Sequence, residues 1–276
     1  MRSPSSFIFL GMYLVPVAKQ TELLKVWQPH AAQVGPFLDT GLVLLLTGTV
    51  GSGKSMTLLQ KYHACALKYA GAQILLVRKA RESLISSTVL MFQDAVIGHD
   101  RHVNHAVSKS RFEYTNGSKV LYGGMLGEKQ RSQVRSIGAE GGLDFVMMEE
   151  ATELEEEDFM ELLGRLRGRA APWRQIGLCC NPDAPTHWVK RLLIDGRMAK
   201  VYHLYTSDNP SLPDTYVQTL EMMTGVQRLR LKEGKWAQTT GAVYKMWDPQ
   251  KHIVEPFPIP PEWTKIRVID FGYNNP

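Results

Sequence analysis

The sequence predicts an α/β fold in which helices flank a mostly parallel β-sheet. Short apolar runs, typical of buried strands, alternate with helical segments along most of the 276 residues. The strand expected at 43–47 leads into a glycine-rich loop, and then into a helix expected over 54–70, which contains no glycine or proline. Asn116-Gly117 between two alternating runs indicates an inserted antiparallel hairpin.

Composition limits the class of protein. The 44% hydrophobic and 21% charged residues are ordinary for a globular chain, and the net charge of +5 is compatible with a nucleic-acid partner without requiring one. The three cysteines lack metal-ligand spacing, so we expect reduced thiols. No apolar run reaches the ~18 residues of a membrane span, and residues 1–25 are expected to be a leader segment rather than a secretory signal.

The glycine-rich loop fits the pattern G-x-x-x-x-G-K-[ST]. Gly51 and Gly53 permit backbone angles at which successive N–H groups turn inward around an anion. Lys54 would supply a point charge for the β- and γ-phosphates, and Ser55 would offer a hydroxyl to Mg²⁺. We therefore predict the fold of a P-loop NTPase that binds ATP and Mg²⁺. The predicted loop residues are Gly48, Thr49, Val50, Gly51, Ser52, Gly53, Lys54 and Ser55.

The remaining elements follow in order along the chain. We expect strands at 73–78, 111–115, 118–122, 143–148, 175–180 and 201–205. An additional strand is expected between the two that carry the nucleotide motifs. Helices are expected at 82–95, from a Thr152/Glu155 capping box to about Arg167, and at 220–231. The polar residues 123–142 are expected to form a loop.

A pair of acids follows the apolar run 145–148. Neighbouring strand residues point in opposite directions, so Glu149 and Glu150 cannot do the same task. By position, Glu149 is the acid on the Mg²⁺ side and Glu150 is the base that orients water. The alternative is the acidic start of a helix, which the acids from Glu153 to Asp158 also fit.

Several segments together resemble the large subunit of tailed-bacteriophage terminases, a DNA-packaging motor. The resemblance runs from about Trp27 to Tyr273, and it rests on the order and spacing of its segments. These are Gln28-Pro29-His30-Ala31-Ala32-Gln33, the runs Leu76 to Leu84 and Leu231 to Trp236, Arg165-Leu166-Arg167, Asn181-Pro182 with His187-Trp188-Val189-Lys190, Gly241-Ala242-Val243-Tyr244 and Asp270-Phe271-Gly272-Tyr273.

The resemblance implies roles for three more residues. Gln33 matches a glutamine that the family places near the adenine. Asn181 matches a polar residue at a strand end that senses the γ-phosphate. Asp270 matches the opening strand of a ribonuclease-H-like nuclease, where it would help to hold a nuclease metal ion.

One departure from the family concerns arginine. Many relatives carry an arginine inside the phosphate loop, whereas positions 49–52 here have none. Arg78 could supply the missing charge from the same subunit, and Arg131 or Arg135 could reach the site of a neighbouring subunit. The alternative for all three is solvated surface charge.

The domain organisation is expected to have three parts. Residues 1–255 would form the ATPase domain, 256–264 a proline-rich linker, and 265–276 the first strand of a truncated nuclease domain. A nuclease of that type needs several carboxylates to hold two metal ions, and only Asp270 is present. We therefore expect this chain alone to cut no DNA.

The resemblance implies that ATP hydrolysis drives double-stranded viral DNA into a procapsid. The implied partners are double-stranded DNA, the portal protein of the procapsid, a small terminase subunit and further copies of the chain in a homo-oligomeric ring, in the cytoplasm of an infected bacterial host and with no membrane. Two alternatives stay open: another P-loop ATPase on nucleic acid, such as a helicase or recombination ATPase, and a nucleotide-binding module without turnover. A GTPase is disfavoured because no N-K-x-D element is found.

Overall fold

The computed structural model describes residues 27–136, 141–238, 256–264 and 266. The chain divides into two units, Met1–Ala237 and Gln238–Pro276, and all that follows concerns the first. The expected leader at 1–25 and Asp270 lie outside the described residues, as do residues 239–255 before the expected linker.

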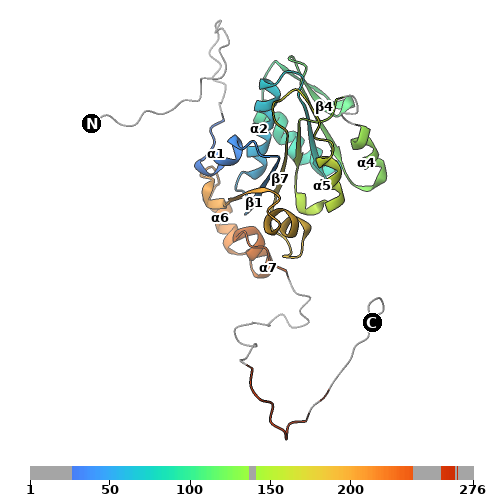
Figure 1. Ribbon diagram of the computed structural model, residues 1–276. Coiled ribbons are helices and arrows are strands. Elements are labelled where there is room, and N and C mark those ends of the chain that lie inside the picture. Colours follow the sequence, from blue (N-terminus) through green and yellow to red (C-terminus); the bar gives the residue numbers. More distant parts are fainter. Residues whose placement is uncertain (1–26, 137–140, 239–255, 265, 267–276) are drawn as a thin grey trace, which may run out of the picture. The chain divides into compact units, whose positions relative to one another are not determined.

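A single mixed sheet forms the centre of the first unit (Figure 1). Within the described residues it has eight strands in the order β3-β4-β5-β2-β6-β7-β1-β8. The pairs β3–β4 and β4–β5 are antiparallel, and the other pairs are parallel. The strands are β1 Val43–Gly48, β2 Gln73–Arg78, β3 Val103–Ala106, β4 Arg111–Tyr114, β5 Lys119–Gly124, β6 Phe145–Met148, β7 Gln175–Cys180 and β8 Lys200–Leu204.

Helices cover both faces of this sheet (Figure 1). The α-helices are α1 Ala31–Leu38, α2 Lys54–Lys68, α3 Arg81–Leu84, α4 Gly127–Ser136, α5 Glu156–Leu163, α6 Asp214–Glu221 and α7 Gly225–Gln227. π-Helical turns span Ile85–Val89, Phe92–Ile97, Val189–Asp195 and Arg228–Lys232, and 3₁₀ turns span Val107–Lys109, Ala151–Glu153 and Thr206–Asp208.

Two hydrophobic clusters explain why the central strands are apolar at successive positions. Every residue of β1, β6 and β7 is buried. Alternate residues enter opposite clusters: Leu44 and Leu46 pack with Leu58 of α2, whereas Val43 and Leu45 belong to the cluster that contains Phe159 of α5. A strand covered on both faces loses the alternation of polar and apolar residues, which is the pattern of a buried parallel sheet.

The strands predicted between residues 43 and 205 are confirmed, and the hairpin forms at Asn116-Gly117 through β4 and β5. The strand predicted within 265–276 lies outside the described residues. β7 is the additional strand, because it lies between β1 and β6. β3, a strand of four residues at the edge of the sheet, was not predicted.

The prediction of a loop throughout 123–142 is wrong, since α4 forms there. Its sequence GEKQRSQVRS has no apolar stripe, and Val134 is its one buried hydrophobic residue among those described. Ion pairs to α5 join the two helices instead: Arg131 Nε lies 2.9 Å from Asp158 Oδ1, and Arg135 Nε lies 3.0 Å from Glu161 Oε1. A hydrophobic pattern cannot reveal a helix held in this way.

The Thr152/Glu155 capping box is also wrong. Thr152 lies in a 3₁₀ turn. The N-cap is instead Glu155, which forms a capping box with Asp158, and the helix begins at Glu156. Leu154, between Thr152 and Glu155, is buried and extended, which delays the helix start. The helix ends at Leu163, before Gly164, rather than near Arg167.

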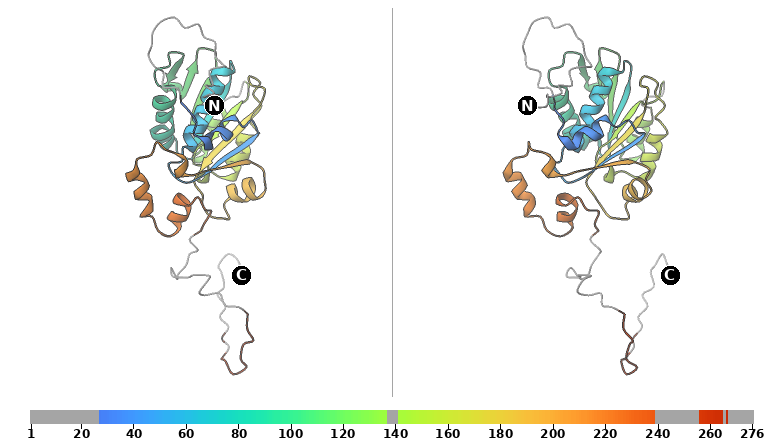
Figure 2. Two further views of the ribbon diagram at one scale, coloured as in Figure 1. Left: turned by 90° about the vertical axis from the view of Figure 1, so that its left-hand side faces the viewer. Right: turned by 60° about the vertical axis from the view of Figure 1, so that its left-hand side comes forward.

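The helix expected at 220–231 is interrupted. α6 ends at Glu221, and a new helical segment begins at Gly225, whose φ of +58° lies outside the right-handed helical region. The segment that carries α6 and α7, coloured orange in Figure 2, follows β8 in the chain. Val50 N donates to Leu231 O at 3.0 Å. This segment therefore contacts the phosphate loop directly.

Candidate nucleotide-binding site

The phosphate loop joins the carboxyl end of β1 to the start of α2. Gly48, Gly51 and Gly53 have φ angles of +142°, +70° and +84°, a region in which side chains are strained. Gly53 is the N-cap of α2, where no side chain caps the helix and no acidic residue lies in the first turn. The backbone donors and the positive end of the helix dipole are therefore available to an anion.

The Lys54 ammonium lies buried inside this loop. Its Nζ donates to Thr49 O at 2.5 Å, to Ser52 Oγ at 3.2 Å and to Asn181 Oδ1 at 3.0 Å. Asn181 directly follows β7, which pairs with β1, so two parallel strand ends bring these groups together. Burial lowers the pKa of Lys54, and the nearby thiols and the acid pair oppose that shift.

Ser55 and Glu149 meet on the other side of the loop. Ser55 Oγ donates to Glu149 Oε1 at 2.7 Å, and Cys179 Sγ donates to Glu149 Oε2 at 2.8 Å. Burial raises the pKa of Glu149, and the two hydrogen bonds counteract it. A hydroxyl and a carboxylate are the hard oxygen donors that suit Mg²⁺. Among the described residues no three His, Cys, Asp or Glu side chains form a metal cluster.

Glu150 leaves the strand in an unusual conformation. Its φ and ψ of +47° and +56° are left-handed, which is uncommon for a residue other than glycine. The half-buried carboxyl has a raised pKa, mainly because of burial and then because of the charge on Glu149. A carboxyl of raised basicity beside a phosphate loop is suited to accept a proton from water.

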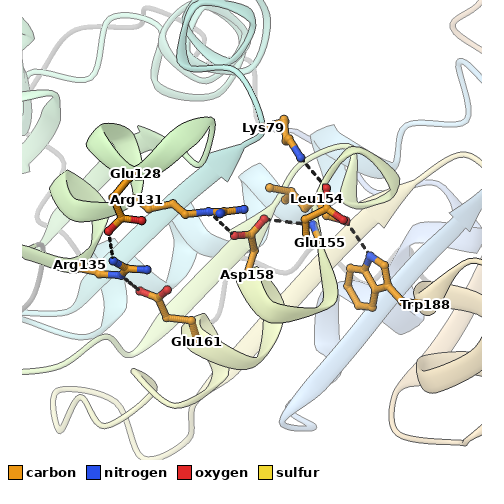
Figure 3. Close-up of polar contacts among 9 residues, drawn as sticks. All are labelled: Lys79, Glu128, Arg131, Arg135, Leu154, Glu155, Asp158, Glu161 and Trp188. Atoms are coloured by element: carbon orange, nitrogen blue, oxygen red, sulfur yellow. Dashed lines mark hydrogen bonds and ion pairs between the residues drawn. The ribbon is translucent and has the colours of Figure 1, made fainter. Parts of the chain in front are cut away.

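The three candidate arginines are all engaged in ion pairs. Arg78 contacts Glu153 through two hydrogen bonds, Nη2 to Oε1 at 2.7 Å and Nε to Oε2 at 3.0 Å, and this contact raises its pKa. The acid pair adds to the same shift, so Arg78 lies within the electrostatic field of Glu149 and Glu150. Arg131 and Arg135 are held by carboxylates on α4 and α5 (Figure 3).

Gln33 of α1 adjoins the phosphate loop. Its Nε2 lies 3.4 Å from Gly53 O, and its Oε1 accepts a hydrogen bond from His30 N at 2.9 Å. A Cβ atom on Gly53 would lie 2.6 Å from that Nε2. The glutamine and the glycine therefore fit closely together at the start of α2.

Residues after β8 donate hydrogen bonds to the phosphate loop. The sequence did not predict them as site residues. Thr206 N donates to Thr49 Oγ1 at 2.5 Å, and Thr206 Oγ1 donates to Val50 O at 2.7 Å. Asn209 Nδ2 donates to Gly51 O at 2.7 Å. These contacts span more than 150 positions in sequence, so no local pattern could have revealed them.

The known proteins that resemble the chain, in sequence and in structure, point to one family. The family model described as phage terminase large subunit matches residues 42–233. The PBSX phage terminase large subunit of Bacillus subtilis (strain 168) is 26% identical over 202 residues, which cover 64% of this chain and 44% of that protein. The chain thus spans less than half the length of this curated relative.

Solved structures share the fold. The large terminase of a thermophilic bacteriophage matches with a TM-score of 0.67 and 18% identity, covering 84% of this chain and 60% of that one. The same phage protein is described in complex with ATP-gamma-S and with ADP. The large terminase ATPase domain of Thermus phage P74-26 matches with a TM-score of 0.55 and 13% identity, covering 76% of this chain and 95% of that one.

Proposed function

The chain belongs to the phage terminase large subunit family, and we propose that it is the ATP-hydrolysing part of a motor that moves double-stranded viral DNA into a procapsid. The nucleotide complexes of the thermophilic phage terminase support ATP as the ligand. The phosphate loop would bind the triphosphate through backbone N–H groups of residues 48–55, with Gln33 near the base.

Each polar side chain in the site has a task in this proposal. The Lys54 ammonium would move from its carbonyl partners to the β- and γ-phosphates. Ser55 and Glu149 would hold Mg²⁺, which, when bound, neutralises charge on the phosphates. Glu150 would accept the proton of the attacking water as its oxygen bonds to the γ-phosphorus and the bond to ADP breaks. Asn181, already bonded to Lys54, would respond to the presence of the γ-phosphate.

The observation that carries the proposal is the meeting of two contacts at one edge of the sheet. Ser55 contacts Glu149 at 2.7 Å, and Lys54 contacts Asn181 at 3.0 Å. Lys54 and Ser55 begin α2, whereas Glu149 and Asn181 directly follow β6 and β7. Ligands of open α/β sheets bind at the carboxyl ends of the strands, which is where these groups lie.

Steady-state ATPase assays test the catalytic part. Lys54→Ala and Glu150→Gln should each lower kcat at least about 100-fold, because they remove phosphate charge stabilisation and the proton acceptor. Lys68→Ala and Glu157→Gln change exposed residues and serve as matched controls. Wild-type turnover equal to that of both site variants would contradict hydrolysis at this site, and nucleotide binding without turnover would favour a structural module.

Duplex DNA tests the motor part. Stimulation of the ATPase rate should be independent of sequence and should decline as salt rises, because grip on DNA uses the phosphates. Strand separation of a forked duplex would instead indicate a helicase, an alternative that the family match does not favour.

The partners are part of the same proposal. We expect a homo-oligomeric ring on the portal protein of the procapsid, a small terminase subunit that delivers the DNA, and action in the cytoplasm of the infected bacterium. No helix among the described residues is long and apolar enough to cross a membrane. Arg78, Arg131 or Arg135 would act as the arginine finger, and each would first have to leave its carboxylate.

The division into an ATPase domain at 1–255, a linker at 256–264 and a nuclease strand with Asp270 remains a proposal. Nuclease activity is tested by incubating plasmid with the purified chain and Mn²⁺. Linearisation that Asp270→Ala abolishes would overturn the expectation that the chain alone cuts no DNA.

A further inference from the structure

A buried thiol touches the carboxylate on the metal side of the site. Cys179 Sγ lies 2.8 Å from Glu149 Oε2, while Ser55 Oγ donates to Oε1 at 2.7 Å. Both oxygens of the carboxylate therefore have a donor. Cys179 and Glu149 are 2% and 7% exposed, so water cannot readily replace the thiol. A buried carboxylate oxygen without a donor is costly, which makes the contact energetically significant.

The register of the sheet places these groups together. β6 and β7 are parallel with Met148 opposite Leu178, so the next residues, Glu149 and Cys179, follow side by side. Cys179 packs in the hydrophobic cluster on the α2 face, whereas Leu178 and Cys180 pack in the opposite cluster. Ser55 lies at the start of α2 itself. The fold thus brings thiol, carboxylate and hydroxyl to one face of the sheet.

We propose that Cys179 is a positioning residue that fixes the orientation of the Glu149 carboxylate for Mg²⁺ binding. The inference rests on the proposed function of this site. While the thiol occupies Oε2, the rotation of the carboxylate is restricted and Oε1 remains on the side of Ser55. When Mg²⁺ binds, Ser55 and Oε1 are then already placed to receive it. Partners that hold a metal-side ligand in this way commonly change metal affinity 10–100-fold.

The opposing explanation is that Cys179 only fills space in the core. The neighbouring Cys180 distinguishes the two, because it is equally buried but faces the other cluster. Its Sγ lies 4.0 Å from Thr47 Oγ1 and makes no hydrogen bond to either acid among the described contacts. Cys180 therefore provides a control with the same chemistry, burial and strand.

The test measures metal binding without turnover. Mn²⁺ binding in the presence of ADP is followed by electron paramagnetic resonance for Cys179→Ala, Cys179→Ser, Cys180→Ala and the unchanged protein. Cys179→Ala should weaken Mn²⁺ binding about tenfold, at the lower end of the range because a thiol is a weak donor. Cys179→Ser keeps a donor and should stay within about twofold of the unchanged protein, as should Cys180→Ala. ADP affinity measured with EDTA should be the same in all four.

Three results would overturn the proposal: unchanged Mn²⁺ affinity in Cys179→Ala, an equal loss in Cys179→Ser, or an equal loss in Cys180→Ala. If Cys179→Ala does not fold, Cys179→Val replaces it, since valine fills the space and also lacks a donor. The ATPase rate of the unchanged protein, compared with Lys54→Ala, reports separately on the proposed function. Turnover lost in Lys54→Ala alongside normal Mn²⁺ binding in Cys179→Ala would refute the positioning role alone, whereas an unchanged protein that binds no Mn²⁺ with ADP would refute both.

Discussion

Gly48→Ala is expected to destabilise the fold severely. Gly48 ends β1 with a φ of +142°, and a Cβ atom there would lie 1.9 Å from Leu204 O in the paired strand β8. That carbonyl also accepts the hydrogen bond from Thr49 N at 3.0 Å, so it cannot move without breaking a contact of the loop. Backbone strain costs ~1–3 kcal/mol, overpacking ~1–3 kcal/mol and the lost hydrogen bond ~1 kcal/mol. The free energy of unfolding should therefore fall by about 3–7 kcal/mol.

Gly71→Ala is the matched control. Gly71 also has a positive φ, +78°, but a Cβ atom there would meet no atom within 4 Å. It should cost only ~1–2 kcal/mol, from backbone strain alone. Urea denaturation followed by far-ultraviolet circular dichroism gives both free energies of unfolding. Equal losses in the two variants would refute the close packing of β8 against the first glycine of the loop.

Arg131→Met should lower the free energy of unfolding by about 2 kcal/mol, because it leaves the buried Asp158 carboxylate without its cation. Arg135→Met breaks a more exposed pair and should cost clearly less. Thermal denaturation measures both, and a larger loss in Arg135→Met would contradict the difference in burial. Thr206→Val removes the donor to Val50 O and should weaken ATP binding about fivefold by calorimetry, whereas Thr219→Val, whose hydroxyl bonds only within α6, should leave affinity unchanged. Burial lowers the pKa of Lys61 to about 8, whereas Lys61 in the unfolded chain has the ordinary pKa of about 10.5. The unfolded state thus binds more protons between these values, so stability should rise by about 1 kcal/mol from pH 8 to pH 9, and Lys61→Met should abolish this rise. Burial and the charge on Glu149 raise the pKa of Glu150, so kcat should decline on acidification already above pH 4.5, and a profile flat down to that pH would contradict its role as base.

The elements that the sequence predicted best are those whose stability comes from local pattern and burial. β2 and β7 have the expected bounds, 73–78 and 175–180, because both lie inside the sheet and each contains a short run of largely apolar residues. The loop at 48–55 is recognisable because its glycines answer a local backbone requirement. Such constraints act over a few residues and can be read from the chain directly.

The missed features depend on contacts between distant residues. α4 is held by ion pairs to α5, so its own pattern contains no apolar stripe. Cys179 lies 30 positions from Glu149, and Thr206 lies 157 positions from Thr49. The capping residue of α5 was misplaced because Leu154 packs in the core before the helix begins. Strand order and packing decide these contacts, and neither can be read from a local pattern in one sequence.

The internal bonding of Lys54 has a consequence for selectivity among anions. Since Thr49 O, Ser52 Oγ and Asn181 Oδ1 already accept from its ammonium, an arriving phosphate competes with these acceptors instead of meeting an unshielded cation. One such exchange gains little free energy, because a bond is broken for each bond made. A ligand that also engages several loop amides at once gains from many exchanges together. The loop would thus respond weakly to inorganic phosphate or chloride and strongly to polyphosphate chains, which discriminates against the commonest small anions of the cell.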